Sequence, residues 1–572
     1  MLRRLSAVLL AAALVAASCA DDDSSTEPPS STSTTTSTTT AASGDDATPP
    51  DDAITVTVGV ESVDTSPLAA RVTIESTVPV TVQITATADD HEVATPVTAA
   101  SATTHDLPLV GMRADRDYVL ALTLTDVAGN ETTVTASATT GPLPDMLPVL
   151  DIVSDPERSS PGITILELNT VSSIFDGLGA PIVGVDEDGE YVWYYNSGTF
   201  SGAAQRTPAG GVAFQHDPFA FSVNDITSRR IAEYYPDPTG ADEPSSDDAG
   251  VEYFPYYADW VDLGAVHHDL VPMADGTLLG LSTTEHPVPA ERRAELCPGD
   301  DEEWNIFSDV IMHVEPDGTV LRTWDLYDIL SFDDHPGEFL CNVQGLSVTP
   351  TRRDWSHANA MWFDAERDAI LVSSRHTDQI VALAMTDETG PQTGVRWILG
   401  NDATMPYDGE SFHHTHGVKT VSNGDILFYD NGNFRPGTLS AGGTDPNYSR
   451  AVRVRVDDSS DDPSEWTATQ VWDHRMIDPV TDELLYAPFI SDADELANGN
   501  ILVTHGGAAV DPNNFLNSHV HVVEIVPDAE NGGDEGGDIV WQLSLGDAEE
   551  SVSMYRADRW ETLYFGALWA DG

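Results

Sequence analysis

The chain has 572 residues, with 95 Asp and Glu against 25 Lys and Arg, which gives a formal net charge of −70 at pH 7. Proteins bind nucleic-acid phosphates and anionic membranes through Lys and Arg, so this balance excludes a nucleic-acid partner and a polybasic membrane patch. A hydrophobic fraction of 40% with 12 Trp is typical of a globular chain with buried cores. The length predicts several domains, or one large repeat fold with a small module.

Residues 1–19 have the pattern of an export signal. Arg3 and Arg4 precede a short apolar run over residues 5–17, which is too short to span a bilayer. The sequence Ala-Ala-Ser-Cys that ends at Cys19 is similar to the cleavage box of bacterial lipoproteins, and this predicts lipidation of Cys19. A plain signal peptide with an incidental cysteine is the alternative. We expect an exported protein, anchored to the outer face of the cell membrane by this lipid alone.

Residues 20–52 consist mainly of Asp, Ser, Thr and Pro, so they cannot bury a core and are expected to form a disordered tether. If Cys19 is lipidated, Cys297 and Cys341 are the only cysteines that remain. They could form a disulfide in an oxidising compartment, although the sequence does not show that they meet.

Residues 53–141 predict a small β-sandwich. Apolar and polar residues alternate over 54–60, 70–76, 80–87 and 118–127, and turn residues separate these segments at sandwich-like spacing. The stretch 111–133 resembles the end of a fibronectin type III domain. We therefore expect an immunoglobulin- or fibronectin III-like module that acts as a spacer.

Residues 142–572 predict a β-propeller. Asp-Gly or Asn-Gly pairs, which are the strongest hairpin signals, precede short apolar strands at 188–189, 275–276, 317–318, 423–424 and 498–499. Hairpins repeated at intervals over more than 400 residues favour a propeller, and we expect six blades, with five or seven as the alternatives. The fold class is thus all-β.

Ten of the 17 histidines form clusters, and most of these clusters precede or end one of these hairpins. In a propeller, corresponding strand ends of successive blades converge on the central channel, so residues far apart in sequence are expected to share one funnel. The clustered histidines are His267, His268, His357, His376, His413, His414, His416, His505, His519 and His521. For any single one of them, a solvent or turn position is the alternative.

Five motifs carry a resemblance to a known family. They are residues 267–276 (HHDLVPMADG), 355–359 (WSHAN), 373–376 (SSRH) with 397–400 (WILG), 415–417 (THG) with 428–432 (FYDNG), and 553–557 (SMYRA). As an ordered set, they resemble the bacterial arylsulfate sulfotransferases, exported enzymes that do not use a nucleotide sulfate donor. The set spans most of residues 150–572, and it does not cover the sandwich.

The resemblance implies an enzyme that moves a sulfuryl group from a phenolic sulfate ester to a phenol by a ping-pong mechanism through a sulfohistidine. The chemistry is consistent with imidazole, which is neutral at working pH and leaves again easily. Cationic or hydrogen-bonding groups should surround the anionic sulfuryl oxygens. No cofactor and no metal are expected, and the partners are a small-molecule donor and acceptor.

The motif matches imply a role for each residue. His416 is the expected nucleophile, and His414 is a second candidate because the family usually has Gln-His-Thr where this chain has residues 415–417. Arg375 is expected to clamp the sulfuryl oxygens, helped by His357 and Asn359.

Further residues are expected around the substrate. His268 is expected near the phenol oxygen as acid, base or clamp, with His267 as its alternative. Thr504 is a weaker candidate from the last blade, and we group it with His267 and His414 as substrate-binding residues.

Two other classes of function remain open. The histidines of residues 413–416, with Asp269 or Asp430, could hold a transition metal. Arg375 argues against this because a guanidinium beside a metal is unfavourable. The second alternative is a non-catalytic, surface-anchored propeller that binds ligands or mediates adhesion, which the tether, the sandwich and the acidity would suit.

Overall fold

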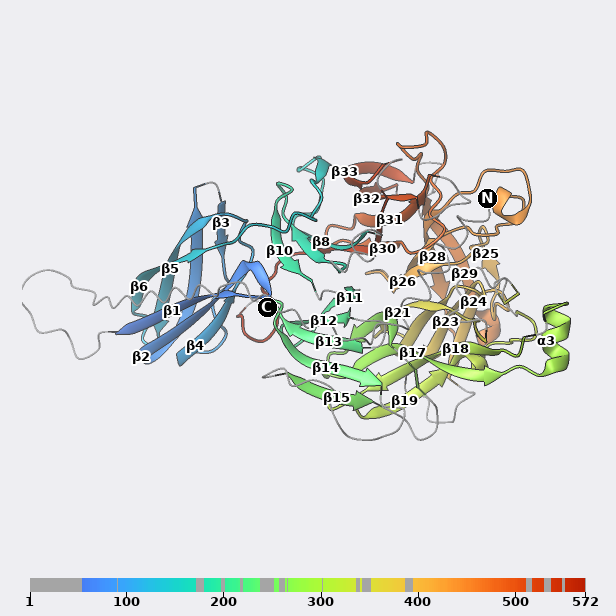
Figure 1. Cartoon of the computed structure of the whole chain (residues 1–572), viewed down its shortest axis with the longest axis horizontal. Coiled ribbons are helices and arrows are strands. Elements are labelled where there is room, and N and C mark those ends of the chain that lie inside the picture. Colours follow the sequence, from blue (N-terminus) through green and yellow to red (C-terminus); the bar gives the residue numbers. More distant parts are fainter. Residues whose placement is uncertain are drawn as a thin grey trace, which may run out of the picture.

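The computed structural model describes residues 54–570 except 90, 171–178, 197–200, 217–219, 237–250, 257–262, 265, 301, 336–339, 342–350, 386–393, 511–516, 529–535 and 548–550. The predicted leader, Cys19 and the tether lie outside the described residues. The described chain is almost entirely strand, and Figure 1 shows a sandwich at one end of the long axis and a ring of sheets beyond it.

The sandwich consists of β1 (Val56–Val63), β2 (Ser66–Ala88), β3 (His91–Ala94), β4 (Ala102–Leu109), β5 (Asp117–Asp126) and β6 (Glu131–Thr139). The sequence predicts separate strands at 70–76 and 80–87, but β2 is one continuous strand of 23 residues. Its first half pairs with β1 and β4 and its second half with β3 and β5, so β2 passes from one layer to the other.

Six further sheets of four or five strands follow in the described residues. The first contains β8 (Ile163–Thr170), β9 (Ile182–Val185), β10 (Tyr191–Tyr195) and β34 (Val552–Trp560). The second contains β11 (Ser201–Arg206), β12 (Gly211–His216), β13 (Ala220–Asp225), β14 (Arg230–Pro236) and β15 (Glu252–Tyr256). The third contains β16 (His267–Pro272), β17 (Leu278–Pro287), β18 (Asn305–Val314), β19 (Val320–Asp325) and β20 (Arg352–Asp354).

The fourth sheet contains β21 (Ala358–Asp364), β22 (Ala369–Ser374), β23 (Gln379–Ala384) and β24 (Val395–Gly400). The fifth contains β25 (Tyr407–Asp408), β26 (His416–Thr420), β27 (Ile426–Asp430), β28 (Arg450–Asp457) and β29 (Thr467–His474). The sixth contains β30 (Asp492–Glu495), β31 (Ile501–Ala509), β32 (Ser518–Pro527), β33 (Gly537–Leu545) and β7 (Asp151–Ser154). Short helices α3 (Ala290–Leu296) and α4 (Leu326–Ile329) and 3-10 turns η2 (Leu439–Ala441) and η3 (Pro463–Glu465) lie between strands.

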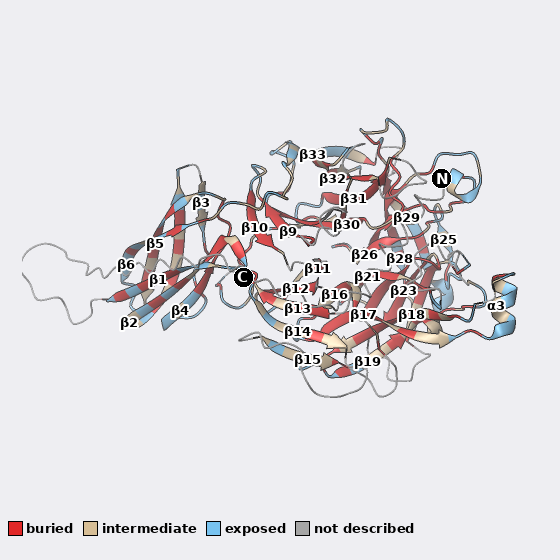
Figure 2. Cartoon of the chain, in the orientation of Figure 1, coloured by how far each residue is buried: buried red, intermediate tan, exposed pale blue. Residues whose placement is uncertain are grey.

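The six sheets are arranged as a propeller. Figures 1 and 2 show them around a common centre, and Figure 2 labels the strands nearest to it, β11, β16, β21, β26 and β30. Consecutive inner strands are in contact around this ring. Middle strands such as β22 and β31 are buried along their whole length because neighbouring sheets cover both faces, whereas β5 in the sandwich alternates (Figure 2). The all-β propeller with a preceding sandwich is therefore confirmed, and the number of blades stays a prediction.

Strands from both ends of the propeller region close the ring. β34 pairs with β8 from Val552 opposite Thr170 to Trp560 opposite Ile163, so it supplies the inner strand of the first sheet. β7 pairs with β33 at the outer edge of the last sheet. The first and last sheets are thus each completed by a strand from the other end of this region.

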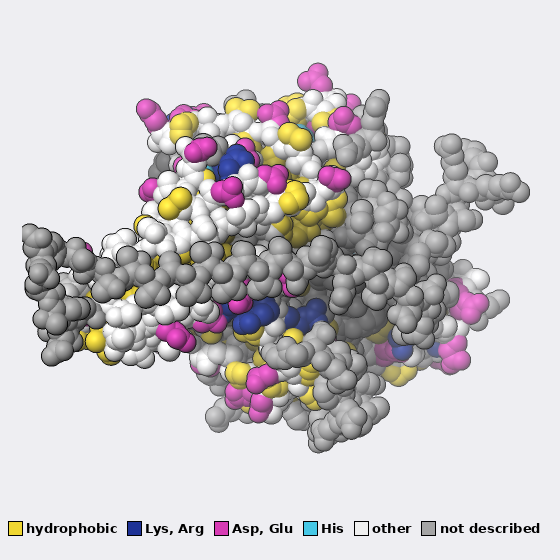
Figure 3. All heavy atoms as spheres, turned by 60° about the vertical axis from the view of Figure 1, so that its left-hand side comes forward, with side chains coloured by type: hydrophobic (Ala, Val, Ile, Leu, Met, Phe, Trp, Pro, Cys, Tyr) yellow, Lys and Arg dark blue, Asp and Glu magenta, His cyan; other side chains and the backbone are white. Residues whose placement is uncertain are grey.

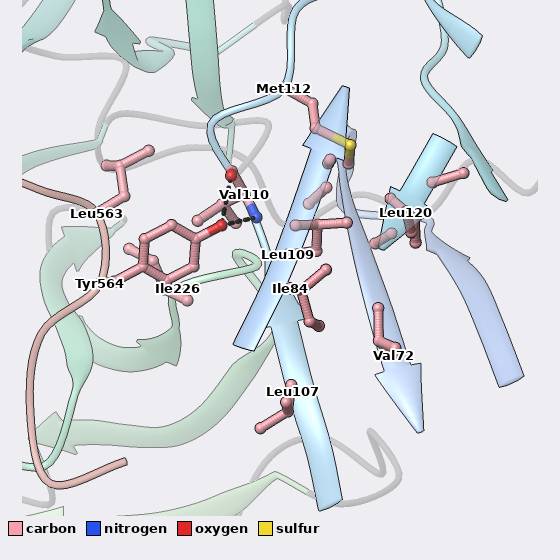
Figure 4. Packing of buried hydrophobic residues seen from close by; sticks show 14 of the residues in the cluster. Val72, Ile84, Leu107, Leu109, Val110, Met112, Leu120, Ile226, Leu563 and Tyr564 are labelled. Atoms are coloured by element: carbon pink, nitrogen blue, oxygen red, sulfur yellow. Dashed lines mark hydrogen bonds between the residues drawn. The ribbon is translucent and has the colours of Figure 1, made fainter. Parts of the chain in front are cut away.

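The sandwich packs directly against the propeller. One continuous hydrophobic cluster contains sandwich residues such as Leu109 and propeller residues such as Ile226 and Leu563 (Figure 4). Within it, the Tyr564 hydroxyl accepts a hydrogen bond from the Val110 N–H (3.2 Å) and donates one to the Val110 carbonyl (2.7 Å). The backbone of a sandwich residue is therefore satisfied by a propeller side chain.

Three further features concern the covalent structure, the surface charge and the helices. Cys297 and Cys341 form a disulfide, which the sequence alone left open. On the face that Figure 3 shows, acidic side chains are scattered and basic ones gather in a few groups. Within the part of the chain that the structure describes, every helix is too short or too polar to cross a membrane.

Candidate active site

Three inner strands carry a β-bulge where the sequence predicts site residues. The pairing register shifts between His267 and Leu270 in β16, between Ala358 and Ala360 in β21, and between His416 and Lys419 in β26. At or beside these bulges, His268 (φ 58°) and His357 (φ 47°) have left-handed backbone, which costs roughly 1–2 kcal/mol for a residue with a Cβ. Bulges re-aim side chains and are frequent next to active sites.

The bulged strands bring a group of aromatic rings together. The ring of His268 lies 4.9 Å from that of His357 and 6.0 Å from that of Tyr555, centroid to centroid. The Tyr555 ring is in turn 6.3 Å from that of His416, and His357 stacks on His376 at 4.5 Å. Residues of the third, fourth, fifth and first sheets therefore share one site, which confirms the expected convergence for His268, His357, His376 and His416. His505, His519 and His521 do not join them, because they lie together with Asp478 in a second group.

A buried hydrogen bond fixes the tautomer of His416. Its Nδ1 lies 2.6 Å from Oδ1 of Asn431. The amide nitrogen of Asn431 donates to the carbonyls of Ala487 (2.7 Å) and Ile490 (2.9 Å), so the Asn431 oxygen must be the acceptor. His416 therefore carries its proton on Nδ1 when it is neutral, and its Nε2 has a lone pair. Burial and the charge of Arg375 hold the pKa of His416 well below its ordinary value.

Two neighbouring side chains hold the backbone around His416. Asn359, which is fully buried, donates from Nδ2 to the carbonyl of Thr415 (2.8 Å). The hydroxyl of Tyr555 donates to the carbonyl of Asn359 (2.7 Å). This chain of bonds links β34, β21 and the start of β26.

His267 and His268 form a pair with one shared proton. Their Nδ1 atoms are 2.7 Å apart, and His267 Nε2 lies 3.1 Å from a carboxylate oxygen of Asp309. Although burial opposes it, the hydrogen bond with Asp309 raises the pKa of His267, whereas burial and cationic neighbours lower that of His268 well below the ordinary value. The shared proton therefore belongs to His267, and neutral His268 carries its own proton on Nε2. His268 contacts the ring group, while His267 lies behind it.

Arg375 supplies a buried positive charge. It is 3% exposed, and its Nη2 donates to the carbonyl of Pro488 (3.0 Å). Burial lowers its pKa to about 10, so it stays protonated at neutral pH. Its charge contributes to the low pKa values of His268, His376 and His416, which means that it lies close to all three.

The remaining predicted histidines face carboxylates. His357 Nδ1 is hydrogen-bonded to Asp354, and the Nδ1 atoms of His413 and His414 lie 3.0 and 3.2 Å from oxygens of Asp378. Burial lowers the pKa of His414 to about 4.

The carboxylates of the alternative metal site are bound elsewhere. Asp269 accepts from Arg556 (3.0 Å), and Asp430 accepts from Arg435 (2.6 Å) and Arg450 (2.8 Å). His413 and His414 instead share Asp378. The geometry thus gives no support to a metal held by residues 413–416 with either carboxylate.

Thr504, which the sequence singles out, and Lys419 on β26 have structural contacts. The hydroxyl of Thr504 on β31 accepts from the backbone N–H of Ala557 (3.0 Å). Lys419 forms ion pairs with Asp492 (2.8 Å) and Asp494, and these pairs raise its pKa despite its burial.

Sequence reasoning missed three acidic contributors to the site, and it assigned no role to Asn431 and Tyr555, although both lie in the quoted motifs. Asp354 lies three residues before His357, and an acidic residue at that distance was an available signal. Asp309 and Asp378 are distant in sequence from the histidines they bind, and only the fold brings them together.

Comparisons with known proteins agree with this geometry. The model of the arylsulfotransferase family matches residues 167–556, and that of the arylsulfotransferase Ig-like domain matches residues 57–141. The second match confirms the immunoglobulin-like sandwich. Arylsulfate sulfotransferase AssT of Escherichia coli O6:H1 is 25% identical over 256 residues, which are 35% of this chain and 40% of that protein.

Two solved structures have weaker likenesses. A protein of unknown function from Bacteroides caccae is 14% identical, with a TM-score of 0.35 over 70% of this chain and 98% of its own. The periplasmic gluconolactonase PpgL of Pseudomonas aeruginosa is 10% identical, with a TM-score of 0.22 over 83% of this chain and 99% of its own. Both TM-scores are too low to bear on the fold.

Proposed function

The chain belongs to the arylsulfotransferase family, and we propose that it transfers a sulfuryl group from a phenolic sulfate ester to a phenol through a sulfohistidine at His416. The observation that carries the proposal is the bond from His416 Nδ1 to Asn431 (2.6 Å). It leaves the lone pair of Nε2 available, and the low pKa of His416 keeps this atom unprotonated at neutral pH. The ring of His416 also lies beside Tyr555 in the ring group (6.3 Å), whereas the ring of His414 lies beside Phe434 (5.5 Å) and its Nδ1 is 3.2 Å from Asp378.

In the first half-reaction, Nε2 of His416 attacks the sulfur and the bond from sulfur to the phenolic oxygen breaks. His268 donates its Nε2 proton to the leaving oxygen and takes the shared proton of His267 on Nδ1. His267 thereby becomes neutral beside Asp309. The 2.7 Å contact between the two Nδ1 atoms supports this relay.

In the second half-reaction, an acceptor phenol gives its proton to Nε2 of His268 while its oxygen attacks the sulfur. The bond from sulfur to Nε2 of His416 breaks, and the electron pair returns to this nitrogen. The Nδ1 proton of His268 passes back to His267. Both half-reactions use the same residues, so the enzyme returns to its starting state.

Arg375 and His357 stabilise the negative charge on the oxygens of the transferred sulfuryl group. The guanidinium is buried beside His416, where a cation stabilises negative charge on the sulfuryl oxygens more strongly than it would in water. His357, held by Asp354, lies at the edge of His268 and is suited to bind a second oxygen. Asn359 acts as a positioning residue, since its amide holds the backbone before His416.

The leader suggests where this reaction takes place. We extend the proposal to a lipoprotein that Cys19 anchors at the outer face of the cell membrane. Labelling with a radioactive fatty acid, together with a Cys19→Ala variant, tests this. Label in the wild type and none in the variant would support the anchor, and equal label would contradict it.

A transfer assay tests the function. The full-length protein, purified in detergent, receives 4-nitrophenyl sulfate as donor and phenol as acceptor, with His416→Ala compared with His313→Ala as a control. His313 contacts Thr277, the residue before β17, and lies outside the ring group, so its loss should leave the rate unchanged. We expect nitrophenol release that depends on phenol and disappears only in His416→Ala.

The outcomes separate the alternatives. Without acceptor, mass spectrometry should find one sulfuryl group on the peptide that contains His416. Release that does not depend on phenol would indicate a hydrolase, and no release from the folded protein with several donors would favour the binding propeller. Full activity of His416→Ala would contradict the assigned nucleophile.

A further inference from the structure

A second group of buried histidines lies in the sixth sheet, away from the candidate active site. His519 and His521 are two residues apart on β32 (Figure 1), so their side chains share one face of the sheet. Asp478, from the segment between β29 and β30, faces them. All three residues are at most 2% exposed. We propose that Asp478, His519 and His521 bind one divalent transition-metal ion of the zinc class.

The distances fit a common metal. Nε2 of His519 and Nε2 of His521 lie 2.9 and 3.3 Å from the same oxygen, Oδ1 of Asp478. The three atoms lie within 4.8 Å of one another. Ligands about 2.0–2.1 Å from zinc are about 2.9 Å apart at a right angle and about 3.3 Å apart at the tetrahedral angle. Two imidazoles and one carboxylate are a donor set that zinc and its neighbours prefer.

Hydrogen bonding alone explains the arrangement poorly. Oδ1 of Asp478 also accepts from the backbone N–H of Val480 (2.9 Å). Three nitrogens thus approach one oxygen, which has two lone pairs, whereas Oδ2 accepts from the Thr481 hydroxyl (3.0 Å). A cation between the two imidazoles and Oδ1 removes this crowding, because each group then directs a lone pair at the ion.

Neighbouring groups already orient the ligands. Nδ1 of His521 contacts the hydroxyl of Ser544 (2.8 Å), which turns its Nε2 toward Asp478. The Thr481 hydroxyl holds the other carboxylate oxygen. Such outer contacts are typical of metal sites, where they fix the tautomer and the direction of each ligand.

The proposed metal site would hold in place a segment that contacts residues of the candidate active site. Asp478 begins a stretch whose later carbonyls, at Ala487 and Pro488, accept from Asn431 and Arg375. A metal that links Asp478 to β32 would therefore fix the start of the segment that contacts Asn431 and Arg375. The binding claim itself does not depend on the sulfotransferase activity.

Metal analysis of the full chain tests the proposal. The protein is produced in medium with added zinc, purified with a tag that contains no histidine, and analysed for all first-row transition metals. We expect about one ion per chain in the wild type. Asp478→Asn should contain almost none.

A matched control separates the two histidine groups. The described residues contain one other such group, Asp354, His357 and His376, which belongs to the candidate active site. Asp354→Asn should keep the full metal content. Loss of the metal in Asp354→Asn but not in Asp478→Asn would overturn the proposal, as would a metal-free wild type.

If Asp478→Asn fails to fold, a second measurement on the wild-type protein tests the proposal. The wild-type protein is unfolded in the presence of a chelator, which removes bound metal, and is then refolded with and without Zn²⁺ or Co²⁺. We expect Zn²⁺ to raise the melting temperature by about 3 °C at a hundredfold excess over Kd. Bound Co²⁺ should give the visible spectrum of nitrogen and oxygen ligands, and an unchanged melting temperature with an aqueous Co²⁺ spectrum would refute binding.

Discussion

Asn431→Ala should lower catalysis by changing the tautomer of His416. The amide oxygen of Asn431 is the acceptor for Nδ1–H at 2.6 Å in a buried site. Without it, the proton of neutral His416 is no longer held on Nδ1 and can move to Nε2, where it blocks the lone pair that attacks sulfur. The variant still contains every group that touches the reacting atoms, so it isolates the effect of the tautomer.

The expected loss follows from the bond that is removed. A buried donor without an acceptor costs about 1–3 kcal/mol, which corresponds to a factor of about 5–150 in the population of the reactive tautomer. We expect kcat/KM to fall by about 10- to 100-fold. Asn431→Ala also loses two bonds to backbone carbonyls, at 2.7 and 2.9 Å, which should lower stability by about 2 kcal/mol.

Ser449→Ala is the matched control. The Ser449 hydroxyl donates to the carbonyl of Asn431 (2.7 Å) and accepts from the N–H of Ala487 (2.8 Å), but it does not touch His416. Removal of this hydroxyl should therefore lower the melting temperature about as much as Asn431→Ala does, while kcat/KM stays within about threefold of the wild-type value. The assay is steady-state release of nitrophenol with phenol as acceptor. Equal kcat/KM losses in both variants, or none in Asn431→Ala, would refute the role of the tautomer.

Three further predictions concern charge and packing. The pKa of His416 lies well below 6.5, so protonation removes the nucleophile only at low pH, and kcat/KM should show no acid limb between about pH 8 and about pH 6; an acid limb centred at 6.5 would contradict this. Arg375→Lys keeps the charge but loses the planar fork, and kcat/KM should fall about 100-fold in the same assay; full activity would exclude a clamp. Tyr564→Phe leaves the buried N–H and carbonyl of Val110 unpaired, so chemical denaturation should show a loss of about 1–3 kcal/mol with unchanged activity; unchanged stability would contradict the role of this contact.

Much of the fold was predictable because local signals agree with it. The Asp-Gly and Asn-Gly pairs lie in hairpin turns, and their glycines at 189, 276, 318, 424 and 499 have φ between 84° and 91°. Only a residue that tolerates positive φ suits these positions. The continuous β2 was not predictable, because Thr77 to Pro79 reads as a break while pairing on both sides extends the strand through it.

The histidines of the site were predictable from the sequence, whereas the side chains that bind these histidines were less so. Converging strand ends bring His268, His357 and His416 together, as the repeated hairpins indicate. Asp309 and Asp378 contact histidines more than 30 positions away, and no local pattern encodes such pairs. Which histidine of a neighbouring pair enters the ring group depends on the bulges, whose positions follow from strand pairing.

The closure of the ring by β34 has a consequence for synthesis. A chain that has emerged only as far as residue 551 already contains every predicted site histidine. It still lacks Tyr555, which lies between His268 and His416 and holds the carbonyl of Asn359. The first sheet also has no inner strand until β34 arrives. The site as described is therefore incomplete until β34 has paired with β8.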